Sequence, residues 1–352
     1  MPSVVVNEEK GTFLSYADSG VPGNSTDYTT VFLIQGYLWH AGLFRPMFPY
    51  AELHNLRLIA VNTREYDGSS PFTDSELSLL MGDEEDQEIM LFAQAEEIAR
   101  FIAHFITHEN IPPLTEANGI RTGGVAISSW STASGLPLAL LANLGKLDSS
   151  LSATLERHMR TIILDDPPSV MYGIPEPSGA YHPLKDVTLA PDQAHTAFLD
   201  FVCSYYEDYP NLESVTADSV RNRRTMPELC SDTKWAATTH SPEELEKYTD
   251  PVAGARLGPG FVDWGVYAEN VWRALLSTQG HWKNVNLVAF WGSKSMWPTP
   301  WGASQMVERL KASPRDGEVR REVRFVRKNN ANHFFHYEHP DVAVQLIREN
   351  LR

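Results

Sequence analysis

Short apolar runs that alternate with amphipathic stretches constrain the fold of this chain more than any other feature of its sequence. Mostly apolar runs occupy residues 30–34, 56–61, 123–128, 161–164 and 286–291, and a strand-like segment that also carries charged residues follows at 319–326. Such runs are typical of strands that are covered on both faces of a parallel sheet. Between them, residues 83–109 carry a broad apolar stripe at helical spacing, and residues 134–145 also have helical character. The alternation predicts an α/β fold with a mostly parallel, doubly wound sheet.

A long interruption divides this pattern. Between residues 167 and 279 the chain contains aromatic residues, prolines and charged helical pieces, but no strand-like alternation. This stretch is too long for an ordinary crossover connection, and 352 residues are enough for about two domains. We therefore predict an α/β core at residues 1–168 and 280–352. We predict that residues 169–279 form a helical insertion that sits over the sheet.

The charge balance limits the classes of partner. The chain has 29 Lys and Arg residues against 45 Asp and Glu residues, which gives a formal net charge of −16. This acidity disfavours binding to nucleic-acid phosphates and anionic membranes. The sequence has no apolar stretch long enough to span a membrane and no secretory signal, so we expect a cytoplasmic protein. Cys203 and Cys230 allow at most one disulfide.

A serine-rich segment follows the run at residues 123–128. It reads Ser128-Ser129-Trp130-Ser131-Thr132-Ala133-Ser134. A nucleophilic serine on a sharp strand-to-helix turn needs small residues two positions before and after it, because the strand and the helix pass close together. Ser131 meets this condition, since Ser129 and Ala133 flank it. The segment predicts Ser131 as a nucleophile, and the alternative is a set of serines that merely caps the next helix.

Such a serine needs a base, and the base needs an acid that orients it. His333 is the first histidine after the last predicted strand and lies in an Asn-rich loop, so we predict it as the base. The run at residues 161–164 ends in Asp165 and Asp166, whose side chains leave the strand end in opposite directions. We prefer Asp166 as the acid because it lies further from the sheet edge, and Asp165 is the alternative.

A metal site is not expected from the histidines. His333, His336 and His339 are spaced H-x-x-H-x-x-H, which contains no pair at i and i+4. The glutamate of the segment directly precedes His339, so the zinc-binding H-E-x-x-H pattern is absent from the sequence.

The chain order Ser131, Asp166, His333 on an alternating α/β scaffold resembles the α/β-hydrolase superfamily. Residues 34–37, Ile-Gln-Gly-Tyr, resemble the oxyanion loop of that family. Residues 62–69 are similar to its D-x-R-x-x-G-x-S turn, with Asn62 in place of the first acid and Gly68 one place late. The resemblance covers nearly the whole chain. It implies the α/β-hydrolase fold, a helical cap at residues 169–279, no metal and no organic cofactor.

The position of the acid narrows this resemblance. In the family the acid commonly lies in a loop that corresponds to residues 292–301, and this loop contains no carboxylate here. An acid after the strand that corresponds to the family's sixth, as at Asp166 after residues 161–164, resembles a subset that includes the fungal zearalenone-lactonase-like enzymes. The chain departs from the family pattern at Gln35, which replaces a histidine, and at Ser129 and Ala133, which replace the glycines of the turn.

The resemblance also implies roles for the neighbours of the nucleophile. The backbone N–H groups of Tyr37 and Thr132 would bind the oxyanion, and Gly36 would let the backbone approach the substrate closely. Trp130, beside the nucleophile, would add an aromatic side chain to the substrate site. Many aromatic residues of the predicted cap would line an apolar pocket.

These expectations define a function. We predict a serine hydrolase that cleaves a carboxylic ester or lactone of an apolar small molecule through an acyl-enzyme, with Ser131, His333 and Asp166 as the triad. Two alternatives remain at this point. The same triad could serve another acyl transfer, a lyase or a cyclase step, or the chain could be a ligand-binding member of the fold without activity.

Overall fold

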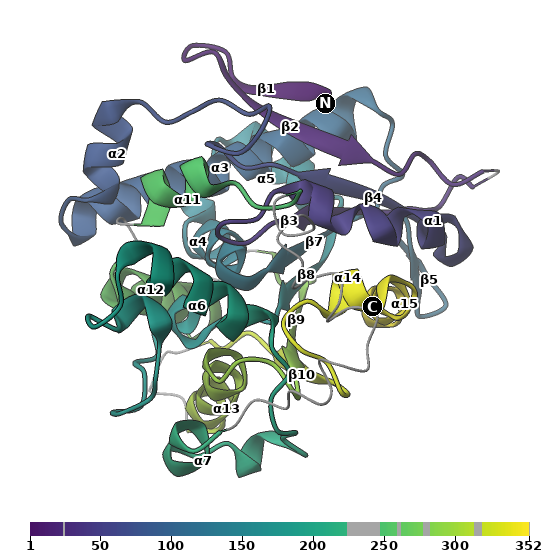
Figure 1. The fold of residues 1–352 in the computed structure, drawn as a ribbon. Coiled ribbons are helices and arrows are strands. Elements are labelled where there is room, and N and C mark those ends of the chain that lie inside the picture. The colour runs from purple at the N-terminus through teal and green to yellow at the C-terminus, as the bar shows by residue number, and fades with distance from the viewer. Residues whose placement is uncertain (24, 224–246, 259–261, 277–281, 313–318, 352) are drawn as a thin grey trace.

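A computed structural model describes residues 1–23, 25–223, 247–258, 262–276, 282–312 and 319–351 (Figure 1). An eight-stranded sheet runs through it in the order β1-β2-β4-β3-β7-β8-β9-β10. Its strands are β1 (Ser3–Asn7), β2 (Thr12–Asp18), β3 (Thr29–Ile34), β4 (Leu56–Val61), β7 (Val125–Trp130), β8 (Met159–Asp165), β9 (Asn286–Gly292) and β10 (Val323–Lys328). Strand β2 runs antiparallel to β1 and β4, and the other neighbours are parallel. The predicted α/β fold with a mostly parallel sheet is therefore confirmed.

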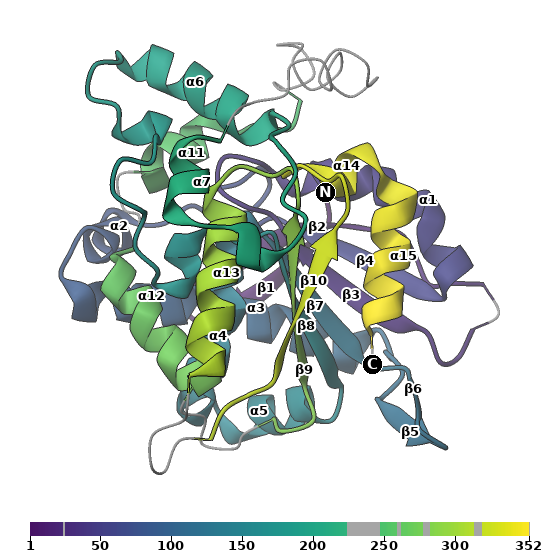
Figure 2. The same cartoon turned by 90° about the horizontal axis from the view of Figure 1, so that it is seen from below.

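The strands form where the sequence is continuously apolar. Strands β3, β4, β7 and β8 are buried along their whole length, because helices cover both faces of the sheet. The helices are α1 (Phe48–Ala51), α2 (Asp74–Leu80), α3 (Glu84–His108), α4 (Gly135–Ala142), α5 (Ser149–Glu156), α6 (Pro191–Cys203), α7 (Ala217–Arg221), α11 (Pro251–Leu257), α12 (Trp264–Val271), α13 (Pro298–Lys311), α14 (Phe335–Glu338) and α15 (Pro340–Asn350). Figure 2 shows α4 and α12 on one side of the sheet and α1 and α15 on the other.

Two hydrophobic cores correspond to the two faces of the sheet. One joins alternate strand residues such as Phe32 and Ile127 to helices α3, α4 and α12. The other joins the opposite residues, such as Leu33 and Ala126, to α14, α15 and the segment after β3. Side chains that alternate along a strand point to opposite faces, so each buried strand contributes to both cores.

The predicted strands agree with the observed ones within a few residues, and the main differences lie in exposed segments. Strand β10 begins at Val323 rather than at residue 319. A short antiparallel hairpin, β5 (Thr115–Ala117) with β6 (Ile120–Thr122), was not expected. Its residues are mostly exposed, so the hydrophobic pattern that predicts core strands is missing there.

The segment at residues 169–279 contains helices and no strand of the sheet in its described part, which is residues 169–223, 247–258 and 262–276. Helices α6 and α11 lie beyond the end of the sheet toward which β10 points (Figure 2). Helix α12 differs, because it packs against α4 and contributes Val266 and Val271 to a core of the sheet. Cys203 is buried at the end of α6, whereas Cys230 lies outside the described residues.

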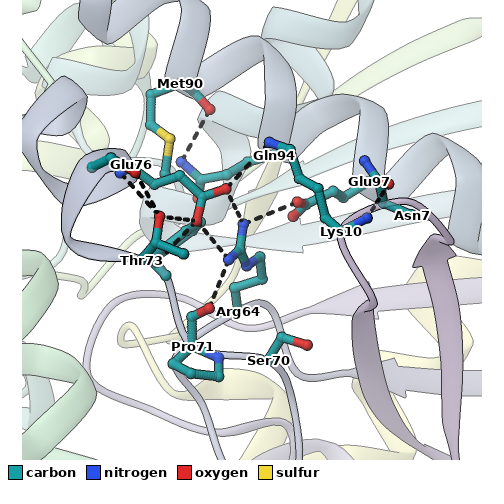
Figure 3. A network of polar contacts seen from close by, with 12 residues as sticks. Asn7, Lys10, Arg64, Ser70, Pro71, Thr73, Glu76, Met90, Gln94 and Glu97 are labelled. Atoms are coloured by element: carbon teal, nitrogen blue, oxygen red, sulfur yellow. Dashed lines mark hydrogen bonds and ion pairs between the residues drawn. The ribbon is translucent and has the colours of Figure 1, made fainter.

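An arginine ties the turn after β4 to two helices (Figure 3). The Arg64 guanidinium donates to Glu76 at 2.8 Å, to Glu97 at 3.3 Å and to the Pro71 carbonyl at 2.6 Å. It also lies over the Phe72 ring, 4.2 Å from the centroid. This arginine belongs to the turn that resembles the D-x-R motif of the family, and it joins β4, α2 and α3 into one unit.

Candidate functional site

Parallel strands bring the predicted site residues to one edge of the sheet. Gly36 and Tyr37 follow β3, Ser131 follows β7, Asp166 follows β8, and His333 lies in the loop after β10. Ligand and active sites of open α/β sheets lie at the carboxyl ends of such strands. The strand order β3-β7-β8 places the first three segments side by side.

Ser131 stands on a sharp turn between β7 and a short helical turn, Ser131–Ser134, that leads into α4. Its φ is 58°, in the left-handed region that residues with a Cβ atom seldom adopt. Gly36 makes room for this turn, because a Cβ atom there would lie 2.8 Å from the Ser131 Cβ. The turn has the geometry of a nucleophile elbow, although serine and alanine occupy the usual glycine positions.

A chain of hydrogen bonds connects the three residues that the sequence singles out. His333 Nε2 lies 2.9 Å from Ser131 Oγ, and His333 Nδ1 lies 2.7 Å from Asp166 Oδ2. All three side chains are buried, with Asp166 fully so. These contacts satisfy the geometric requirement for a nucleophile, a base and an orienting acid.

Asp166 is held ionised by donors from the loop that lacks a carboxylate. The Gly292 N–H donates to Oδ1 at 2.6 Å, and the Ser295 hydroxyl donates to Oδ2 at 2.5 Å. Burial alone would raise the pKa of Asp166, but the positive charge of Lys328 and the hydrogen bonds from His333 and Ser295 hold it below its ordinary value. Sequence reasoning missed Ser295, because this contact exists only in the folded chain.

Asp165 faces a different partner. Its Oδ1 accepts a hydrogen bond from Lys328 Nζ at 2.6 Å, and the lysine side chain is almost completely buried. The structure thus places Asp166, and not Asp165, against His333. The opposite directions of adjacent side chains at a strand end explain this separation.

Trp130 lies beneath the histidine loop and not among the residues that line the cavity described below, which corrects its expected contact with substrate. Its indole Nε1 donates to the His333 carbonyl at 2.9 Å, and its ring packs 4.9 Å from the His333 ring. Successive side chains of β7 point to opposite faces of the sheet, so Trp130 points to the side opposite Ser129. On that side it packs into the hydrophobic core that contains Leu33 and Ala126.

The loop that carries His333 is also tied to α6. Asn332 Nδ2 donates to Glu338 Oε1 at 2.6 Å and to the Cys203 carbonyl at 3.1 Å, and the Tyr205 hydroxyl donates to the other oxygen of Glu338. Burial raises the pKa of Glu338 to about 9. This network holds the base from the side of the predicted cap.

The two backbone N–H groups expected to bind the oxyanion are those of Tyr37 and Thr132, and the Tyr37 N–H already donates a hydrogen bond to a side chain. The Tyr37 N–H donates to the Thr132 hydroxyl oxygen at 2.8 Å. The Thr132 N–H belongs to the first turn after Ser131, where backbone N–H groups have no acceptor within their own helix. Thr132 therefore influences both expected donors, one through its backbone and one through its hydroxyl.

A cavity of about 700 Å³ lies in front of Ser131 and His333. Most of its lining is apolar and comes from the loop after β3, from the segment after β8 and from helices α6 and α11. Its apolar members include Tyr37, Trp39, Val170, Ile174, Leu184, Phe198, Val202, Trp264 and Met296. A cavity of this size and character suits an apolar small molecule.

The described residues contain no group of three or more His, Cys, Asp and Glu side chains that could hold a metal ion. His336, which sequence reasoning considered with His333 and His339, is buried between the rings of Phe44 and Trp130. Burial holds the pKa of His336 well below its ordinary value, so its ring is neutral. In the part of the chain that the structure covers, no helix is long and apolar enough to cross a membrane.

Comparison with known proteins shows similarity of fold but not of sequence. The sequence matches no protein-family model and no curated protein. The structure is similar to an esterase from Exiguobacterium antarcticum (TM-score 0.53, 12% identity, 97% of this chain and 96% of the other). It is also similar to a bromoperoxidase from Bacillus anthracis (TM-score 0.51, 11% identity, 99% of both chains).

A third similar structure is the 2-hydroxy-6-oxo-6-phenylhexa-2,4-dienoate hydrolase from Rhodococcus sp. strain RHA1 (TM-score 0.51, 11% identity, 99% of this chain and 96% of the other). At these identities the similarity identifies the α/β-hydrolase fold. The chemistry of this chain has to be argued from its own site.

Proposed function

We propose that the protein is a serine hydrolase that cleaves a carboxylic ester or lactone of an apolar small molecule. The observation that carries this proposal is the hydrogen-bonded chain from Ser131 through His333 to Asp166, which opens onto a largely apolar cavity. A nucleophile, its base and an orienting acid within hydrogen-bond distance are the minimum set for acyl transfer through a serine.

The reaction follows from these positions. His333 Nε2 accepts the Ser131 proton as Ser131 Oγ attacks the carbonyl carbon, and Asp166 stabilises the imidazolium that forms. The imidazolium then protonates the leaving alkoxide as the carbonyl–oxygen bond breaks, which leaves an acyl-serine. Water enters, His333 takes one of its protons, and the resulting attack releases the carboxylic acid and restores Ser131.

The negative charge of the tetrahedral intermediate falls near the backbone N–H groups of Tyr37 and Thr132. Loss of one such donor typically costs about 3–4 kcal/mol of transition-state stabilisation. Because the Thr132 hydroxyl accepts from the Tyr37 N–H, its side chain has to rotate away before Tyr37 can bind the oxyanion. Gly36 lets the loop after β3 lie close to Ser131, because a Cβ atom at this position would collide with the Ser131 side chain.

The cavity supports an apolar ester or lactone as the substrate class. We infer that helices α6 and α11 form the cap over the site, because both line the cavity at the carboxyl end of the sheet. The acid after β8, the sixth strand of the main sheet in chain order, supports the resemblance to zearalenone-lactonase-like enzymes. No cofactor is needed for this chemistry.

The proposal is tested with a panel of para-nitrophenyl esters of increasing acyl length and a panel of aromatic lactones. We expect turnover that Ser131→Ala abolishes, and Ser134→Ala serves as the matched control from the same turn. Reaction in oxygen-isotope-labelled water separates hydrolysis from lyase or cyclase chemistry, because hydrolysis places the label in the acid product. Turnover that survives Ser131→Ala would refute the proposal.

A further inference from the structure

One segment, residues 176–185, supplies ionisable side chains to the part of the cavity wall that lies away from Ser131 and His333. Apart from Tyr37, the described ones are Glu176, His182 and Lys185. Glu176 and Lys185 form an ion pair with 2.7 Å between Oε2 and Nζ. Their charges therefore compensate each other, and His182 is the remaining uncharged polar group of this wall.

The segment is held by two tryptophans at the start of α13. The Trp301 indole N–H donates to the Pro175 carbonyl at 3.0 Å, and the Trp297 indole N–H donates to the Tyr181 carbonyl at 2.7 Å. The first bond lies next to Glu176 and the second next to His182. Two anchors of this kind fix the position of the segment relative to the loop that supports Asp166.

His182 continues a row of aromatic rings that begins at the expected oxyanion loop. The Tyr37 ring lies 6.2 Å from the Phe198 ring, and Phe198 lies 6.3 Å from the His182 ring. Phe201 contacts the imidazole from another side, at 5.5 Å between centroids. The imidazole is thus two ring spacings away from Tyr37, along the cavity wall.

The His182 ring has unused hydrogen-bonding capacity. Its Nδ1 is buried and has no hydrogen-bond partner in the part of the chain that the structure describes. Burial lowers the pKa of His182, so the ring is neutral and carries one donor and one acceptor nitrogen. Nδ1 has almost no accessible surface, so the ring has to turn toward the cavity before this atom can meet a ligand. A buried polar atom without a partner costs free energy that such a contact can recover.

We propose that His182 forms a second polar subsite of the cavity and binds a neutral hydroxyl, such as a phenol, at the end of the substrate remote from its scissile carbonyl. The inference rests on the proposed hydrolase function, because it assigns the other end of the same substrate. A carboxylate fits this wall less well, since Glu176 is part of it and Lys185 is already paired.

The test compares matched substrates that differ in one hydroxyl. The pairs are para-nitrophenyl esters of phenylpropanoic and phenylpentanoic acids, each with and without a para-hydroxyl on the phenyl ring. We expect kcat/KM to favour the hydroxylated member of at least one pair by about tenfold, the effect of a hydrogen bond worth about 1.4 kcal/mol. His182→Phe keeps a ring without nitrogens, so we expect it to remove the preference.

The readout is the ratio within a pair, so a general loss of activity cancels. Tyr181→Phe changes a neighbouring, exposed side chain and is expected to keep the ratio. The proposal is wrong if the unmodified protein shows no preference for either pair, or if His182→Phe retains the preference. Calorimetric titration of the esters into Ser131→Ala gives the same ratio as an affinity, so it tests His182 even if the proposed hydrolysis fails.

Discussion

At the scale of single residues, the two adjacent aspartates illustrate how environment divides similar groups. Asp166 accepts hydrogen bonds from His333, Gly292 and Ser295, whereas Asp165 pairs with Lys328. Both are buried at the end of β8, so composition and burial do not distinguish them. Their hydrogen-bond partners distinguish them. Loss of the Asp166 carboxylate is therefore expected to lower turnover, whereas loss of the Asp165 carboxylate is expected to lower stability.

We expect Asp166→Asn to keep the fold and lower kcat strongly, because an amide favours the wrong tautomer of His333. In a serine protease the comparable change costs about 10⁴-fold. Asp165→Asn removes the carboxylate that is hydrogen-bonded to the buried Lys328, so its main effect is expected on the free energy of unfolding. The measurements are the turnover of one ester and the urea unfolding of both variants. A larger loss of turnover in Asp165→Asn than in Asp166→Asn would assign the acid to Asp165.

Thr132 offers a second residue-scale prediction. Thr132→Val is nearly isosteric and removes the acceptor that engages the Tyr37 N–H. We expect kcat/KM to stay level or rise, because the N–H group is then available to the oxyanion, while Thr132→Ser retains the present behaviour. A fall of about 10²-fold or more in the valine variant alone would show instead that the hydroxyl itself binds the oxyanion.

At the scale of secondary-structure elements, the buried strands were predictable and several connections between them were not. Residues 56–61 and 286–291 are mostly apolar because both faces of the sheet are covered there, and such burial leaves a direct signal in the sequence. The hairpin β5–β6 and helix α5 carry no comparable signal. The chain order of Ser131, Asp166 and His333 could be read from strand ends, whereas the support from Ser295 depends on tertiary contacts.

Helix α6 is the element with the most direct influence on the cavity. It contributes Phe198 and Val202 to the lining. Phe198→Ala enlarges the space next to Tyr37, so we expect kcat/KM to rise for esters with bulky acyl groups relative to the acetate ester. Kinetics of para-nitrophenyl esters measure this ratio, with the exposed Gln193→Ala of the same helix as control. An equal change for all esters would mean that α6 only supports the fold.

At the scale of the whole molecule, the cluster around Arg64 links stability to pH (Figure 3). The hydrogen bond from Arg64 lowers the pKa of Glu76 to about 2, whereas burial raises the pKa of Glu97 to about 7. For Glu97 burial outweighs the attraction of Arg64. The unfolded chain releases this proton near pH 4.3, so the folded state holds it over the window from about pH 4 to 7. Stability from this group therefore falls as the pH rises through that window.

Glu97→Gln mimics the protonated carboxyl and removes this dependence. We expect the variant to unfold at a urea concentration similar to that of the unmodified protein near pH 4, and at a higher one near pH 8. Glu96→Gln, which removes a surface pair with Arg100, is the control and is expected to have a small effect at both values. A variant that is less stable near pH 8 would show that the Arg64–Glu97 attraction exceeds the cost of burial.

The central claim is that Ser131 is a nucleophile activated by His333. It is tested most directly by labelling with a fluorophosphonate and mapping the modified peptide by mass spectrometry. We predict one adduct per chain on Ser131, no adduct in Ser131→Ala, and slow labelling in Asp166→Asn. An adduct on Ser128 or Ser134, or labelling that persists in Ser131→Ala, would contradict the assignment.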